Sequence, residues 1–136
     1  MKPFPWRPGM RARAILADGS IEPVIGVVVG LMADALPIVY WPDLNATRAH
    51  AGDLRHLDPV RDDAATLGAL LGVVREVWNA PLAQVTPWLR WDPVRRVNVV
   101  DGWRVCLNDA TDRRCPPNER AESEFAALLA AYQEAP

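Results

Sequence analysis

The stretch from residue 23 to residue 41, PVIGVVVGLMADALPIVYW, restricts the fold more than any other part of the chain. Its apolar residues are mostly β-branched or aromatic, which favours strands. A membrane-spanning helix needs about 20 consecutive apolar residues, and here Asp34, two prolines and two glycines interrupt the run. The segment therefore predicts two strands, residues 24–32 and 36–41, joined by a tight connection, and no membrane span.

Further strand signals surround this pair. Residues 9–16, GMRARAIL, predict a first strand, and residues 46–51 and 55–57 predict two shorter ones after a turn. Five short strands linked mainly by tight turns are typical of a small β-barrel. We therefore expect a barrel over residues 9–59, preceded by a proline-rich leader of residues 1–8.

The segments GVV, PIVYW and GDLRHL resemble those of an SH3-like barrel of the KOW or Tudor type. In such barrels a glycine-containing second strand precedes an apolar and aromatic third strand, and an acidic-leucine turn leads into the fifth. The resemblance covers residues 9–59. It implies a fold that binds protein segments or nucleic acid and rarely catalyses a reaction, and it specifies no ligand.

The segment RAHAGDLRHLDP, residues 48–59, contains both histidines of the chain with an aspartate midway between them. His50, Asp53 and His56 would be three potential metal ligands if they converged. The alternative is a one-turn 3₁₀ segment that closes the barrel, in which Asp53 satisfies free backbone N–H groups and the histidines lie on different strands. A structural zinc site uses four ligands, and apart from two aspartates no fourth candidate is nearby. We expect the turn, and no metal.

The pattern changes to helical spacing after residue 60. Asp62 or Asp63 is a suitable N-cap, Asn79 and Pro81 end the run, and Leu71 lies at the centre of the apolar stripe. The residues of this stripe are Leu67, Leu70, Leu71, Val74, Val77 and Trp78.

Three strands and a second helix follow in the predicted order. The strands are residues 85–91, 95–100 and 102–107, with Asp-Gly at 101 and 102 as a hairpin signal, and the helix is residues 118–133. The order is α-β-β-β-α, and we expect both helices on one face of an antiparallel sheet. The fold class is thus α+β: a small SH3-like β-barrel followed by a two-layer α-β-β-β-α domain over residues 60–136.

The segment DDAATLGALLGVVREVWNAP, the Trp-rich strands and the closing Ala/Leu helix resemble a small α/β sandwich domain of bacteriophage and prophage proteins. The resemblance covers residues 60–135 and implies a phage or mobile-element accessory protein, without any catalytic residue. Double-stranded RNA-binding domains share the α-β-β-β-α order. Here, however, the acidic segment PPNERAESE opens the last helix, which disfavours phosphate, so we exclude that family.

The chain offers little for catalysis. Its only serines, Ser20 and Ser123, have no histidine nearby in sequence, and P-loop and GxGxxG motifs are absent. Cys106 has the pattern of strand packing, and Cys115 follows two arginines in a loop, where such arginines are usually solvated. The proline-rich start lacks the apolar stretch of a secretory signal. We expect a cytoplasmic, non-enzymatic protein with reduced cysteines and without a cofactor.

Two classes of binding function remain. A net charge of −2 gives no overall attraction to nucleic acid or membranes, and six tryptophans suit a protein partner, which is our first expectation. The partner would be a host protein, and a homo-oligomer stays open. The alternative is nucleic-acid or nucleotide binding by the Trp/Arg-rich sheet face and by residues 1–13, which carry four basic and no acidic side chains.

Strand alternation predicts where this binding would occur. One face would turn Leu89, Trp91, Val97, Val99, Trp103, Val105 and Leu107 toward the helices. The opposite face would present an aromatic platform with two guanidinium groups, which suits a base and phosphate or a protein hot spot. The equally weighted alternative is that this face only packs on the barrel or on a second subunit. The binding residues that we predict on it are Trp88, Arg90, Asn98 and Arg104, beside Val100 and Cys106.

Overall fold

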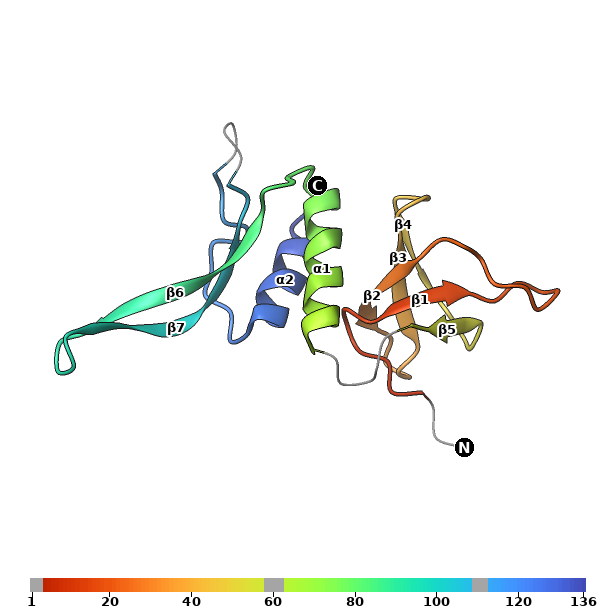
Figure 1. The fold of residues 1–136 in the computed structure, drawn as a ribbon, viewed down its shortest axis with the longest axis horizontal. Helices are drawn as coiled ribbons and strands as arrows, with labels where there is room; N and C mark the ends of the chain where they lie inside the picture. The colour runs from red at the N-terminus through yellow and green to blue at the C-terminus, as the bar shows by residue number, and fades with distance from the viewer. Residues whose placement is uncertain (1–3, 58–62, 109–112) are drawn as a thin grey trace. The chain divides into compact units, whose positions relative to one another are not determined.

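The computed structural model describes residues 4–57, 63–108 and 113–136 of the chain. It has two compact units, Met1–Val73 and Val74–Pro136, and their boundary falls within helix α1 (Asp63–Val77). The fold is α+β, with antiparallel sheets and two helices (Figure 1). The predicted division between residues 59 and 60 lies outside the described residues.

The first unit contains a five-stranded antiparallel sheet. The order across the sheet is β4-β3-β2-β1-β5, and the five strands lie where the sequence predicts them. Because β4 and β5 are the edges and do not pair, the described strands form an open sheet rather than a closed barrel. The SH3-like arrangement therefore stays a prediction. The strands are β1 (Arg11–Ala14), β2 (Gly26–Leu31), β3 (Pro37–Trp41), β4 (Ala46–Ala49) and β5 (Leu54–His56).

The core of this unit lies against β2 and β3. Met10, Val28, Val39 and Trp41 are buried together, and partly buried residues, Leu54 among them, pack around the cluster. Gly26 allows this packing, because a Cβ atom there would lie 2.5 Å from Cγ1 of Val39 and 2.8 Å from the Trp41 ring. The β-branched sequence of β2 and β3 thus forms the predicted strands and also supplies the core.

Helix α1 buries a face one position away from the predicted one. Leu70 and Val74 are fully buried and Val73 nearly so, whereas Leu71 is only half-buried. The prediction that Leu71 is central was therefore wrong, because the stripe alone does not tell which edge faces the core. The helix ends at Val77, and Asn79, one of the two residues predicted to stop it, follows two residues later with a φ of 50°. Within the described residues, neither helix is long and apolar enough to cross a membrane.

Residues 84–106 form two strands and not the three that were predicted. β6 (Gln84–Asp92) and β7 (Val97–Cys106) pair as one long antiparallel hairpin. Its turn is fixed by Asp92, whose Oδ1 accepts hydrogen bonds from the backbone N–H of Val94 at 2.9 Å and of Arg95 at 3.2 Å. The predicted α-β-β-β-α order is thus wrong, and the described order is α-β-β-α.

Asp101 and Gly102, predicted to be a hairpin turn, form a β-bulge inside β7. The register shifts there, so that both residues lie opposite Trp88. Gly102 adopts a φ of 135°, and a side chain at this position would collide with Arg120. The Asp-Gly pair suits a turn and a bulge alike, because glycine tolerates the positive φ that both require.

Helix α2 (Glu124–Gln133) begins six residues later than predicted. Ser123 is its N-cap, and the Ser123 hydroxyl accepts a hydrogen bond from the N–H of Ala126 at 3.1 Å. Ala121 instead exchanges two backbone hydrogen bonds of 2.9 Å with Trp103 of β7. The residues before the cap therefore extend the sheet, and α2 packs against β7 and β6.

Candidate binding surface

The hairpin brings three of the four predicted binding residues to one face. Trp88 and Arg90 are two residues apart on β6 and therefore share a face. Arg104 of β7 lies on the same face, on the other side of the bulge. Asn98 is paired with Trp91, so it lies on the opposite face. The expectation that Asn98 shares the platform was wrong, because the bulge reverses the alternation of every residue between it and the turn.

The three platform residues contact one another or an aspartate. The guanidinium carbon of Arg104 lies 5.0 Å from the centre of the Trp88 ring, within cation–π range. Nε of Arg90 lies 3.6 Å from Oδ2 of Asp101, and Arg120 forms a hydrogen-bonded ion pair with the same oxygen. Much of this positive charge is therefore balanced within the protein.

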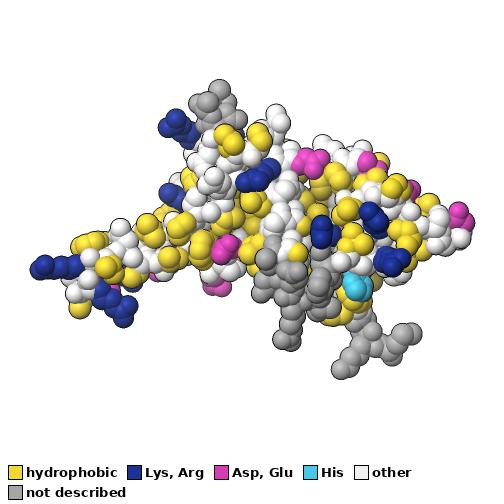
Figure 2. All heavy atoms as spheres, in the orientation of Figure 1, with side chains coloured by type: hydrophobic (Ala, Val, Ile, Leu, Met, Phe, Trp, Pro, Cys, Tyr) yellow, Lys and Arg dark blue, Asp and Glu magenta, His cyan; other side chains and the backbone are white. Residues whose placement is uncertain are grey.

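The opposite face of the hairpin is apolar and largely uncovered. Leu89 and Val100 are a cross-strand pair and Trp91 follows on β6; we call these three residues the apolar arm face. Each of the three side chains is more than half exposed, Trp91 to 56%, and Val94 in the turn is exposed to 90%. Figure 2 shows hydrophobic side chains along this part of the hairpin and basic ones at its end.

The sequence placed Leu89, Trp91, Val97 and Val99 under the helices, and this expectation was wrong. Val97 and Val99 lie on the platform face, because the bulge reverses their alternation. Leu89 and Trp91 lie on the opposite face but are more than half exposed. The helix that packs on the hairpin, α2, has 10 residues and so spans about 15 Å, whereas the 10 residues of β7 span about 33 Å. A helix of this length covers only the half of the hairpin near its base, where Val105 and Leu107 are buried. Figure 1 shows the turn end extending past α2.

The two histidines do not form a joint site. Nε2 of His50 accepts a hydrogen bond from the Trp41 indole N–H at 3.0 Å, and Nδ1 of His50 lies 3.1 Å from both carboxylate oxygens of Asp53. His56 instead stacks on Phe4, with ring centres 4.3 Å apart. The described residues contain no group of three His, Cys, Asp or Glu side chains placed to hold a metal ion.

Asp53 has a different role from the predicted capping turn. The segment around Gly52 is a bend rather than a 3₁₀ turn, and the Asp53 carboxylate binds a side chain, that of His50. Burial acts to raise the pKa of Asp53, but hydrogen bonds from His50 and from its own backbone N–H, together with the nearby charge of Arg48, outweigh it and lower the pKa. Because the indole N–H can only donate, His50 Nε2 is the acceptor and Nδ1 carries the proton toward Asp53.

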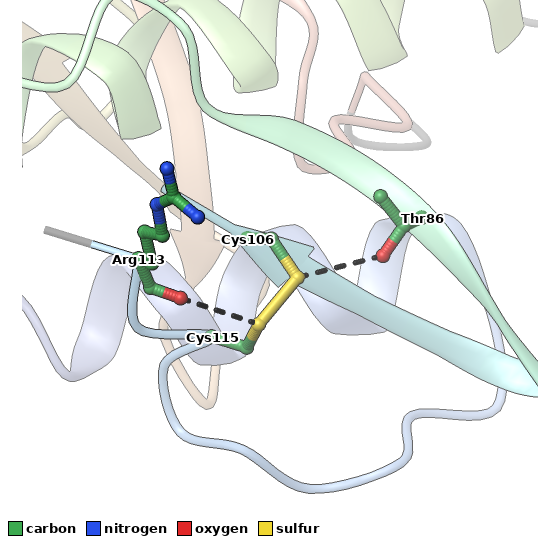
Figure 3. The surroundings of a disulfide bond; sticks show 4 residues. All are labelled: Thr86, Cys106, Arg113 and Cys115. Carbon is green, nitrogen blue, oxygen red and sulfur yellow. Dashed lines mark hydrogen bonds between the residues drawn. A yellow bond between two sulfur atoms is a disulfide. The ribbon is translucent and has the colours of Figure 1, made fainter. Parts of the chain in front are cut away.

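The cysteines are joined, contrary to the expectation that they are reduced. Cys106, the last residue of β7, forms a disulfide with Cys115 in the returning loop (Figure 3). The backbone N–H of Leu107 donates to the carbonyl of Arg114 at 2.9 Å, which brings the two ends of the loop together. Two cysteines nine residues apart give no pairing signal by themselves, since only the path of the loop makes them adjacent.

The surroundings of the two sulfur atoms differ. Cys106 is 7% exposed, and the Thr86 hydroxyl, 3.6 Å from its sulfur, is the donor because a disulfide sulfur carries no hydrogen. Cys115 is half-buried and lines a solvent-open hollow of about 510 Å³. Trp78, Arg113, Arg114 and Glu134 are among the other residues that line this hollow.

Comparison of the chain with protein families, with curated proteins and with solved structures gave no match.

Proposed function

We propose that the chain is a non-enzymatic binding protein, and that the apolar arm face inserts into an apolar groove with an acidic rim on a partner protein. The exposure of Leu89, Trp91 and Val100 on a hairpin that α2 covers only at its base carries this proposal. Exposed apolar patches of this kind mark interaction sites, and tryptophan is a frequent binding hot spot.

The charge of the hairpin supports an acidic rim. Its residues 84–106 contain four arginines and two aspartates. Both aspartates already form ion pairs with arginines. Asp101 pairs with Arg90 and Arg120, and Oδ2 of Asp92 lies 3.8 Å from Nε of Arg95. The turn end is therefore positive, and complementary acidic groups would orient the partner around it.

Nucleic acid, the alternative expected from the sequence, is less well supported. On the predicted platform a base would have to stack on Trp88, but Arg104 already lies over this ring. Phosphate binding needs cations without nearby anions, but Arg90 and Arg120 share Asp101. The predicted platform and the origin in a phage or mobile element stay predictions.

A photo-crosslinking experiment tests the proposal. A photoreactive phenylalanine analogue is placed at Val94 on the hairpin turn and, as a control, at Leu44 in the first unit, which is 56% exposed. In cells of the source organism, we expect a discrete protein adduct from position 94 and none from position 44. The adduct should disappear when Leu89→Thr and Val100→Thr are combined, because both changes suit a strand and remove apolar surface.

Three results decide the matter. A protein adduct that still forms in the double variant refutes the proposal. A crosslink to nucleic acid that no longer forms when the sample is irradiated at high salt also refutes it. An adduct between two copies of the chain would replace the separate partner by self-association, which sedimentation would confirm.

With a purified partner, Trp91→Ala should weaken binding by about 2 kcal/mol, or roughly thirtyfold in Kd.

A further inference from the structure

The disulfide offers its two sulfur atoms to the solvent unequally. Cys115 lines the open hollow, whereas Cys106 is almost entirely buried beside Thr86 (Figure 3). Thiol–disulfide exchange requires an accessible sulfur for attack and a partner sulfur that can leave as a thiolate. The Thr86 hydroxyl, which donates toward Cys106, would stabilise that thiolate.

We propose that Cys106–Cys115 is a thiol–disulfide exchange site for a small thiol that carries carboxylate groups. The thiol first loses its proton to solvent, and its thiolate attacks Sγ of Cys115. A new bond forms between the two sulfurs as the Cys106–Cys115 bond breaks, and Cys106 leaves with the bonding pair as a thiolate. The incoming sulfur is oxidised to a mixed disulfide and Cys106 is reduced, so that electrons balance.

The hollow indicates the class of thiol. Among the residues that the structure describes, two with guanidinium groups, Arg113 and Arg114, and one with a carboxylate, Glu134, line the hollow. Arg114 also lies over the Trp78 ring, 5.3 Å from its centre, which holds this arginine at the wall of the hollow. An anionic thiol is therefore favoured over a cationic one.

The loop also favours the reverse step, in which the Cys106–Cys115 disulfide forms again. The hydrogen bond between Leu107 N–H and Arg114 C=O joins the residues next to the two cysteines, and it does not involve the sulfur atoms. Cys106 can thus attack Sγ of Cys115 in the mixed disulfide and release the thiol. Reversible disulfides are the kind expected in a reducing compartment such as the cytoplasm.

The first test locates the adduct. The oxidised full chain is exposed briefly to reduced glutathione, free thiols are alkylated, and the protein is digested with trypsin. Cleavage after Arg104, Arg113 and Arg114 places the two cysteines on separate peptides. We expect glutathione on Cys115 and the alkyl group on Cys106, in an excess of about tenfold or more over the reverse pattern. Equal labelling, or glutathione mainly on Cys106, overturns the proposal.

The second test measures selectivity for charge, with cysteamine as a cationic thiol of small size. Arg113→Ala should slow reduction by glutathione about fivefold, the effect of one unit charge at about 4 Å in water, without slowing reduction by cysteamine. Arg95→Ala, at the exposed hairpin turn, is the matched control and should change neither rate. If Arg113→Ala slows both thiols equally or neither, the hollow does not select an anionic thiol.

Single-cysteine variants keep the site testable if exchange proves too fast to sample. With oxidised glutathione, Cys106→Ser leaves only Cys115 and should be thiolated rapidly, whereas Cys115→Ser leaves only buried Cys106 and should react slowly. Circular dichroism of both variants verifies that they are folded. Equal rates in two folded variants would contradict the proposed direction of attack.

Discussion

Replacing Gly26 by alanine should destabilise the first unit, because side chains of β3 already fill the space that a Cβ atom would occupy. The added Cβ would lie 2.5 Å from Cγ1 of Val39 and 2.8 Å from the Trp41 ring, whereas unstrained carbon contacts are about 3.5–4.0 Å. Neither neighbour can yield easily. Val39 is fully buried and β-branched, and the Trp41 indole N–H donates to His50.

Overpacking of a well-packed core costs about 1–3 kcal/mol. Alanine also restricts the unfolded chain, which returns about 0.4–1 kcal/mol. We therefore expect Gly26→Ala to lower the free energy of unfolding by about 1–2 kcal/mol. Gly30 on the same strand is the matched control, since its added Cβ would meet only Cδ1 of Ile38 at 3.8 Å. Gly30→Ala should be neutral or slightly stabilising.

Urea unfolding followed by tryptophan fluorescence measures both variants against the wild type. The midpoint should fall for Gly26→Ala and stay or rise for Gly30→Ala, with an unchanged slope. If Gly26→Ala is as stable as the wild type, or if both glycines respond alike, the close approach of Val39 and Trp41 to residue 26 is refuted.

Three further predictions concern stability. Leu70→Ala should lower the free energy of unfolding by about 2–5 kcal/mol and Leu71→Ala by clearly less, since only Leu70 is fully buried; equal losses in urea unfolding would contradict the assigned helix face. Folding lowers the pKa of the Asp53 carboxyl below its ordinary value of 3.8, so the ionised carboxylate stabilises the fold at pH values above 3.8. This contribution is lost as the pH falls below 3.8. The urea midpoint of Asp53→Asn should therefore fall less between pH 5 and pH 3 than that of the wild type, and an equal fall would refute the role of this carboxylate. Replacing either Cys106 or Cys115 by alanine should lower the free energy of unfolding by about 2.6 kcal/mol, because the unfolded chain is no longer closed into a loop between residues nine apart in sequence. A reductant should then destabilise the wild type but neither variant, and a reductant effect on the variants would show that it acts elsewhere.

The strands of the first unit could be predicted because their signals are local. β-branched runs around Gly26 and Pro37, separated by short polar turns, leave the chain few alternatives to antiparallel pairing. The start of α2 could not be predicted in this way, because residues 118–123 have helical spacing. The hydrogen bonds between Ala121 and Trp103 decide the matter, and they join residues distant in sequence.

The candidate site depended on a single ambiguous dipeptide. As a turn, Asp101-Gly102 would have produced three strands, whereas as a bulge it produces two, and the side chain of Asn98 then changes face. Exposure of Trp91 was equally beyond the sequence, because strand alternation tells which residues share a face and not how far a helix reaches along it. The sequence thus predicted a binding face on this hairpin, and the structure moves only Asn98 away from the other three predicted residues.

The distribution of contacts over the hairpin explains how its apolar face can stay open. An isolated two-stranded hairpin is only marginally stable in water, so this arm needs support along its length. At its base the hairpin is supported by α2 and by the disulfide of Cys106. Beyond α2, the side-chain contacts described above lie on the platform face: Arg104 over Trp88, and the ion pair of Arg90 with Asp101. Because these contacts hold the two strands together from one side, the opposite side need not be buried for the arm to fold. The contacts on the platform face thus explain how the apolar arm face can stay exposed, which the proposed binding of a partner requires.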